Sequence, residues 1–392
     1  MTNTNEKKVN WSAIFPVSII FAVISLAALL LIAIPPLITT PDPTAEPQPT
    51  EASTYYIIDT YEELVSKNLS VAEEAVYNTD KVLWIRDDAD AAPVPNSECF
   101  GQADDPSSLR WLLDDAENVL EGQETVFQTD IEIVPGSKIT YYLDDTIFVV
   151  VWQEVFDNFV YTMAEVKIMH PSQFRRHLAG NEYNSDYIHP TSYMANVVNA
   201  VMASSADYYR GRHHGIIVYQ GEVKRTEYSD LVDTCFIDSN GDLILVPANE
   251  LNGDETVQAF VDEHDIDFSL AFGPILVNNG ERCEPLDYYL GEVNDKYPRA
   301  ALCQKDKLHY VVVMANAKDT YVSSPTIHTF AKNVATLGCE KAYALDGGQT
   351  GTISMMGTAQ NPLKKQERWI TDIIYFATAI PSEEDVTEPT SP

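Results

Sequence analysis

The sequence predicts a mixed α/β fold of the α+β class with a mixed β-sheet core, preceded by one transmembrane helix and a proline-rich stalk. Three observations support this prediction. A wholly apolar segment lies near the N-terminus, runs of β-branched and aromatic residues recur from about residue 139 onward, and few segments among those runs have helical spacing. Because the strands outnumber the helices and their connections vary, regular doubly wound units are not expected.

The composition is that of a largely folded protein with a strong negative charge. Of the 392 residues, 45% are hydrophobic, and 25 Lys and Arg are outnumbered by 59 Asp and Glu, which gives a formal charge of -34. This hydrophobic fraction can fill a sizeable core. The negative field repels nucleic acid, so no nucleic-acid partner is expected, and an anionic ligand would need arginines close by.

The apolar segment at residues 13–38 is predicted to be an uncleaved transmembrane signal-anchor. It carries no charged side chain and is long enough, as a helix, to cross a hydrocarbon core of about 30 Å. Lys7 and Lys8 precede it and the next cation is Lys67, so residues 1–12 are expected in the cytoplasm and the remainder outside the cell. A cleaved signal peptide is the alternative, but no clear small-x-small cleavage site follows. We therefore expect the membrane as a partner and the cell membrane as the location.

Two segments are predicted to stay outside any packed core. Residues 39–54 contain four prolines among Thr, Asp and Glu, a composition that remains extended and predicts a stalk. Residues 381–392 combine acidic residues with Pro, Ser and Thr, which predicts a disordered acidic tail.

Residues 55–136 are predicted to form a mainly helical, membrane-proximal region. Thr60 can cap an acidic segment at Tyr61–Lys67, and Ser107–Leu120 carries apolar residues at helical spacing. No catalytic pattern is visible here. The region is either a spacer or a small cap on the main domain.

Residues 139–380 are predicted to form the main domain, which is rich in strands. Thr146–Trp152 and Val160–Ile168 are separated by an Asp-Asn pair, which predicts a hairpin. Helices are predicted at Thr191–Ala203 and Ser324–Leu337. Apolar runs bounded by turn residues predict six further strands, at Gly215–Gln220, Leu243–Val246, Ala271–Val277, Leu308–Met314, Ala342–Leu345 and Ile370–Phe376.

One of these strands leads straight into a loop suited to an anionic ligand. Asp346 follows the apolar run and is succeeded by Gly347, Gly348 and, two residues on, Thr350. Glycines let the backbone approach a ligand closely, and successive amides in such a turn can bind a phosphate group. A tight turn after a core strand is the alternative interpretation.

Several segments occur in the order found in one protein family. They are the small-residue segment Ala203–Asp207, Arg212 with the strand after it, the Gly-Pro strand Phe272–Val277, the Pro-Arg pair at Arg299, the Asp-Gly loop, and Glu367-Arg368 near the end. In these segments the chain resembles the phosphodiester glycosidases, and most closely their bacterial, exopolysaccharide-associated members. The resemblance covers residues 139–380.

The resemblance implies hydrolysis of the bond between the anomeric carbon of a sugar and a phosphodiester. Such a reaction passes through oxocarbenium-like charge, so it needs a carboxylate at the sugar and cations on the departing phosphate. The candidate catalytic residues are Asp346 and Asp207, whose roles could be exchanged, and Arg299. The candidate substrate and phosphate ligands are Arg212, Gly347, Gly348, Thr350 and Glu367.

Three departures from the family pattern affect the prediction of turnover. Gln349 stands where a third glycine is usual, Ala300 where a threonine usually follows the arginine, and Ala206 where a glycine usually precedes the acid. If position 349 needs positive φ or close ligand approach, its side chain costs on the order of 1 kcal/mol or obstructs the site. One alternative function is therefore a weakened member that binds surface glycans in envelope assembly.

No metal or cofactor is expected. The histidines show no ligand spacing, and the acidic run Asp262–Asp267 lacks the ordered oxygens of a calcium loop. The five cysteines are far apart, without a C-x-x-C pair, and are expected to be mostly free thiols. A metal-dependent phosphoesterase that cleaves the phosphorus-oxygen bond is the second alternative.

The leading prediction is a membrane-anchored extracellular hydrolase. Its expected substrate is a sugar-1-phosphodiester in a cell-surface polysaccharide or glycoconjugate. The residues predicted to carry the reaction all lie between residues 139 and 380.

Overall fold

The computed structural model describes residues 55–58, 83–86, 92–227, 229–284, 295–316, 324–363 and 366–380, the first two ranges as backbone only. The chain divides into two compact units, Met1–Pro49 and Thr50–Pro392, and all described residues belong to the second. The predicted transmembrane helix at 13–38, the stalk at 39–54, the helix at Tyr61–Lys67 and the tail at 381–392 lie outside the described residues. None of the helices in the described ranges is long and apolar enough to span a membrane.

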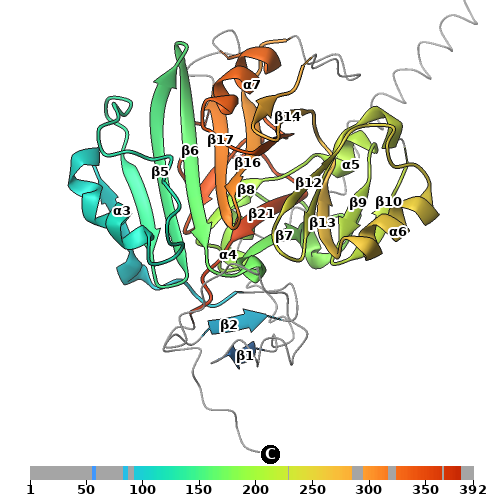
Figure 1. Cartoon of the computed structure of the whole chain (residues 1–392), viewed down its shortest axis with the longest axis horizontal. Coiled ribbons are helices and arrows are strands. Elements are labelled where there is room, and N and C mark those ends of the chain that lie inside the picture. Colours follow the sequence, from blue (N-terminus) through green and yellow to red (C-terminus); the bar gives the residue numbers. More distant parts are fainter. Residues whose placement is uncertain are drawn as a thin grey trace, which may run out of the picture. The chain divides into compact units, whose positions relative to one another are not determined.

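A nine-stranded antiparallel sheet is the largest element of the described chain (Figure 1). In sheet order its strands are β15 (Glu281–Arg282), β14 (Ile275–Asn278), β18 (Lys341–Leu345), β16 (Arg299–Asp306), β17 (His309–Asn316), β6 (Phe159–Ile168), β5 (Ile147–Phe156), β4 (Ile139–Leu143) and β3 (Phe100–Ala103). The predicted hairpin is confirmed as β5 and β6. Its turn residues Asp157 and Asn158 have φ of 46° and 67°, as a two-residue type I′ turn requires.

A five-stranded sheet shares a hydrophobic core with the first. In order its strands are β20 (Thr358–Ala359), β19 (Ile353–Met355), β8 (Met202–Ser205), β21 (Asp372–Phe376) and β7 (Phe174–Leu178). Phe174 stacks on Phe376 with ring centroids 4.5 Å apart and lies 4.9 Å from the ring of Tyr310 on β17. The two sheets are therefore joined by tightly packed aromatic rings.

Three smaller ladders complete the β structure. They are β12 (Leu243–Val246) with β11 (Thr234–Asp238) and β13 (Ile266–Leu270), β10 (Glu222–Arg225) with β9 (Ile217–Tyr219), and β1 (Tyr55–Ile58) with β2 (Leu83–Arg86). Every strand pair named in the described ranges is antiparallel, so the parallel strands that a mixed sheet would contain are not found there. Several neighbouring strands, such as β5 and β6, are consecutive in sequence and joined by tight turns, which can connect antiparallel strands only.

The helices are short, and α4 packs on the inner strands β19, β8 and β21 of the five-stranded sheet. The α-helices are α3 (Arg110–Ala116), α4 (Thr191–Val197), α5 (Tyr209–Arg212), α6 (Asp254–Glu263) and α7 (Ile327–Ala335). The 3₁₀ helices are η2 (Ser97–Cys99), η3 (Pro106–Leu109), η4 (Pro171–Gln173), η5 (Ala179–Asn181) and η6 (Ser229–Leu231). Helix α7 begins after Thr326, whose side chain accepts a hydrogen bond from the backbone of Thr329.

Helix α4 is shorter than the sequence predicts. It ends at Val197, and Asn199 follows with a φ of 54°, a left-handed conformation that stops the helix. Met202 and Ala203 were expected in that helix but belong to the central strand β8, where Ser205 pairs with Ile373. Met202 and Ala203 favour a helix by intrinsic preference, but the pairing of β8 with β19 and β21 overrides it.

The described part of region 55–136 is helical at η3 and α3, which overlap the predicted helix Ser107–Leu120, but it also contains strands that were not predicted. They are strands β1, β2 and β3, and Phe100 of β3 pairs with Tyr142 of the main sheet. Leu112 of α3 and Phe127 are buried in the same core as that sheet. Residues 100–127 therefore belong to the main domain, because their buried apolar side chains pack in the core of the main sheet.

Candidate active site

A cleft of about 460 Å³ opens where β16 begins and β18 ends. Antiparallel pairing sets Ala300 opposite Leu345. One step further along both strands, Arg299 and Asp346 come side by side, although they are far apart in sequence. The lining includes Tyr208, Arg212, Phe272, Tyr297, Pro298, Arg299, Asp346, Gly347, Gly348, Gln349 and Arg368.

Asp346 is the one acidic side chain among the described residues that line this cleft, and it is half-buried. Its backbone N–H donates to the carbonyl of Ala206 at 3.0 Å, which ties the end of β18 to the end of β8. Burial raises the pKa of Asp346 to about 6. A hydrogen bond from Thr350 and the charges of Arg212 and Arg368 oppose this rise. A carboxylate titrating near 6 can accept a proton at neutral pH.

Three arginines line the same cleft, each beside an aromatic ring. The guanidinium of Arg212 lies 4.1 Å from the ring centroid of Phe272 and donates to the Phe272 carbonyl at 3.0 Å. Arg299 lies 5.7 Å from the ring of Tyr297, and its Nη2 donates to the carbonyl of Asp295 at 2.7 Å. Together these contacts hold two planar guanidinium groups in fixed positions beside Asp346.

The third arginine, Arg368, lies 5.6 Å from the ring of Tyr208 and is exposed. It was quoted in the sequence motif, but its neighbour Glu367 was named as the ligand. Of the two residues, Arg368 lines the cleft. Glu367 lies outside the cleft lining, and its carboxylate accepts the backbone N–H of Ser192 at 2.9 Å, at the start of α4.

The glycine loop is held by its own hydrogen bonds. A Cβ added at Gly347 would lie 2.4 Å from the carbonyl oxygen of Pro298, so only glycine fits there. Gly348 has a φ of +66°, and its N–H donates to the same carbonyl at 2.8 Å. The buried hydroxyl of Thr350 donates to the carbonyl of Gly347. The Gly348 amide and the Thr350 hydroxyl thus make hydrogen bonds within the loop. The sequence predicts them as ligand-binding groups instead.

Gln349 does not carry the backbone strain that the sequence suggested. The left-handed conformation of this loop falls on Gly348, and Gln349 has a negative φ. Its exposed side chain belongs to the lining of the cleft. Any effect of Gln349 on turnover therefore arises in the cleft and not from the backbone.

Asp207 lies outside the cleft lining, in a buried ionic cluster with Arg176 and Asp372. Arg176 Nη2 is 3.0 Å from Asp207 Oδ2 and 2.6 Å from Asp372 Oδ2, with all three side chains at most 1% exposed. Asp207 also accepts the backbone N–H groups of Tyr209 at 2.6 Å and Ala271 at 3.0 Å. It therefore positions the chain segments that carry Tyr208, Arg212 and Phe272, and it does not reach a ligand in the cleft.

The partners of Asp207 were missed from the sequence. Burial raises the pKa of Asp372, and the nearby Asp207 carboxylate raises it further. One signal was available in the sequence: Arg175 and Arg176 are adjacent cations between the apolar residues Phe174 and Leu178 of a strongly acidic chain. Such a residue must be paired if it is buried.

The described residues contain no group of three or more His, Cys, Asp or Glu side chains placed to hold a metal ion. The five cysteines are free thiols. The acid and the three arginines of the cleft are thus the charged groups that its described lining offers to a ligand.

Residues 195–377 match the phosphodiester glycosidase family, so this segment is similar to the hydrolases of that family. No curated protein matches the chain.

Two solved structures show weaker similarity. The catalytic domain of zebrafish N-acetylglucosamine-1-phosphodiester alpha-N-acetylglucosaminidase, auto-inhibited by its pro-peptide, has 14% identity and a TM-score of 0.47 over 59% of this chain and 82% of that one. A hypothetical protein from Synechocystis has 11% identity and a TM-score of 0.43 over 63% of this chain and 64% of that one. Similarity at this level identifies neither a substrate nor a reaction.

Proposed function

We propose that the cleft hydrolyses the glycosidic bond of a sugar-1-phosphodiester. The observation that carries this proposal is the placement of one half-buried carboxylate, Asp346, in the same cleft as Arg212, Arg299 and Arg368. In a chain with a formal charge of -34, three arginines gathered in one cleft favour an anionic ligand there.

The chemistry requires little more than these groups. Guanidinium groups bind phosphate oxygens through paired donors, and they stabilise the charge that develops when the phosphate departs. The C1–O bond breaks with its electron pair on the phosphate oxygen, and a water oxygen adds to C1. Phosphate is a good leaving group, so a second carboxylic acid to protonate it is not needed.

Asp346 takes one of two roles in this scheme. As a base it removes the proton of the attacking water, and as a carboxylate beside C1 it stabilises the oxocarbenium-like charge. Both roles need its ionised form, which the raised pKa of about 6 still allows at neutral pH.

The proposal extends to location and substrate. The apolar segment at 13–38, with cations on its N-terminal side only, supports a membrane anchor that leaves the β-rich domain outside the cell. A cell-surface polysaccharide or glycoconjugate is the corresponding substrate. We take N-acetylglucosamine as the first sugar to test.

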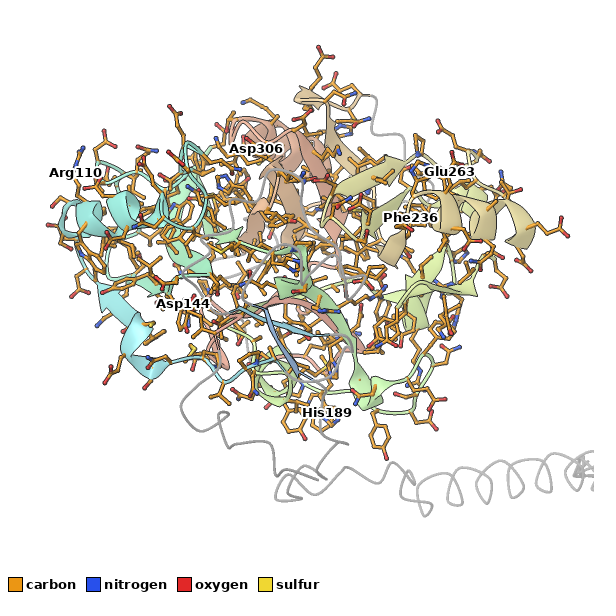
Figure 2. The ribbon with its side chains drawn as sticks, turned by 60° about the horizontal axis from the view of Figure 1, so that its bottom comes forward. Arg110, Asp144, His189, Phe236, Glu263 and Asp306 are labelled. Carbon is orange, nitrogen blue, oxygen red and sulfur yellow. The ribbon has the colours of Figure 1, made fainter. Side chains whose placement is uncertain are left out.

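The test is hydrolysis of the methyl diester of α-N-acetylglucosamine-1-phosphate in ¹⁸O-labelled water. We expect label in the released sugar, and Asp346→Asn should lower kcat by about 10²–10⁴-fold. Asp306→Asn is the matched control, since Asp306 lies on the surface at the end of β16 (Figure 2). Label in the phosphate would assign the reaction to a phosphoesterase, and equal rates for wild type and Asp346→Asn would remove the proposal.

A further inference from the structure

A cluster of exposed aromatic rings surrounds His189, which is labelled in Figure 2. Tyr193 lies 4.5 Å, Trp369 6.0 Å and Tyr187 6.3 Å from the His189 ring, all within 30° of parallel to it. These three rings are 43%, 39% and 55% exposed, respectively. Exposed aromatic residues gathered in this way indicate a binding surface. We call Tyr187, Tyr193 and Trp369 the aromatic platform.

The platform is fixed to the rim of the cleft. Residue His189 pairs with Ile370 through two backbone hydrogen bonds of 3.0 and 2.9 Å, and Glu367 binds the backbone of Ser192. Arg368 lies between these two attachment points, and it lines the cleft together with Tyr208. The segment 366–370 thus carries both Arg368 of the cleft lining and Trp369 of the platform, so one short piece of chain joins the two sites.

The chemistry of the platform suits a neutral ligand. The segments that form it, 181–193 and 366–370, contain three acidic residues and a single arginine. Burial lowers the pKa of His189, which keeps its ring uncharged at neutral pH. An anionic bilayer or a nucleic acid would meet repulsion here. The apolar face of a pyranose ring, with its rim of hydroxyl groups, matches the face and the polar edge of Tyr and Trp.

We propose that the aromatic platform is a second binding subsite, which holds a neutral pyranose chain extending from the sugar phosphodiester in the cleft. The substrate class is then an oligosaccharide or polysaccharide that carries the phosphodiester, and not a free sugar phosphate. This inference rests on the proposed function for the position of the reacting sugar. The binding of the chain itself is independent of catalysis and is tested separately.

The first test measures binding without turnover. Full-length Asp346→Asn protein in nanodiscs is titrated by calorimetry with cellohexaose, maltohexaose and chitohexaose. We expect at least one hexasaccharide to bind, and Trp369→Ala and Tyr193→Ala each to weaken that binding about tenfold. Trp111→Ala is the matched control, because Trp111 is 47% exposed and also contacts a tyrosine, Tyr141. Absence of binding by all three sugars, or an equal loss in Trp111→Ala, would overturn the proposal.

The second test separates the platform from the cleft. With the methyl diester of α-N-acetylglucosamine-1-phosphate, which is too short to reach the platform, Trp369→Ala should keep the wild-type kcat and KM. A fall in kcat with this short substrate would place Trp369 in the reaction and contradict the proposal. If wild type releases no sugar but hexasaccharide binding still depends on Trp369, the proposed function fails while the glycan subsite stands.

The third test addresses the bilayer as an alternative occupant. Wild type and Trp369→Phe are compared in nanodiscs that contain brominated lipid, which quenches nearby indole fluorescence. We expect the same fractional quenching in both proteins. If the fractional quenching is lower in Trp369→Phe than in wild type, Trp369 lies against the bilayer. This result would overturn the glycan subsite.

Discussion

The cleft and the buried ionic cluster use the same two residue types for opposite purposes. In the cluster, Arg176 bridges Asp207 and Asp372 with side chains at most 1% exposed. In the cleft, the half-buried Asp346 lies beside arginines that are held by aromatic rings and backbone carbonyls. The cluster pairs its charges with one another in the core, whereas the charged groups of the cleft line an opening in the surface.

The difference teaches that environment, and not residue type, assigns the role of an acid in this fold. Asp207 accepts two backbone N–H groups in addition to Arg176, which occupies its oxygens. Asp346 has a pKa raised to about 6 because burial outweighs its favourable partners. Only the second arrangement leaves a carboxylate able to exchange a proton with a substrate.

The largest effect that would test this comparison is the loss of the buried arginine. Arg176→Met leaves two carboxylates buried together without a cation, and we expect the free energy of unfolding to fall by about 3–5 kcal/mol. Arg210→Met is the control, because Arg210 pairs with the 99% exposed Asp186. There the loss should not exceed about 1 kcal/mol. Urea denaturation measures both, and equal losses would contradict the structural role of Arg176.

The next effect separates the two candidate acids. Asp207→Asn should lower the free energy of unfolding by about 1–3 kcal/mol, because one backbone N–H or the Arg176 guanidinium loses its acceptor. Asp346→Asn should leave that free energy unchanged or raise it at pH 7, because folding raises the pKa of Asp346 and so disfavours its ionised form. Denaturation and kinetics on both variants measure this. A severe stability loss in Asp346→Asn would break the distinction.

Local patterns predicted much of the fold. The hairpin of β5 and β6 and the strands β12 and β18 have their predicted positions, since each is an apolar run bounded by turn residues. The end of α4 was wrong because Asn199 adopts a left-handed conformation that the sequence does not impose. Strand β7 was missed, and its charged residues Arg175 and Arg176 conceal the apolar pattern.

The residues of the site could be predicted in part, because motif order locates residues along the chain but does not show their contacts. Motif order located Arg299, Arg212 and Asp346, and the pairing of β16 with β18 brings the first and last together. Sequence order could not show that Asp207 lies beside Arg176 and Asp372, because that contact joins residues from three strand regions. It also could not decide between Glu367 and Arg368, which are adjacent in sequence but face different partners.

The pH dependence of the reaction offers a smaller but sharper test. The pH–rate profile should have a rising limb with its midpoint near pH 6, because Asp346 acts in its ionised form. Arg212 lowers the pKa of Asp346, so Arg212→Gln should move this limb to higher pH. A displacement of half a pH unit lowers the relative rate below the limb about threefold. Arg210→Gln is the control, because Arg210 lies outside the cleft lining. If Arg212→Gln leaves the midpoint of the limb unchanged, the limb belongs to the titration of another group.

The smallest expected effect concerns Gln349. Its φ is negative, so Gln349→Gly relieves no strain and should lower the free energy of unfolding by about 0.5–1 kcal/mol through a more flexible unfolded chain. Because Gln349 still lines the cleft, kcat/KM decides its role. We expect a change of less than about threefold, which is near 0.6 kcal/mol. A gain above tenfold would instead show that the Gln349 side chain obstructs the phosphate site and that this chain is an attenuated enzyme. Gly348→Ala, which places a Cβ at a φ of +66° with no atom within 4 Å, is the matched control for loop strain alone.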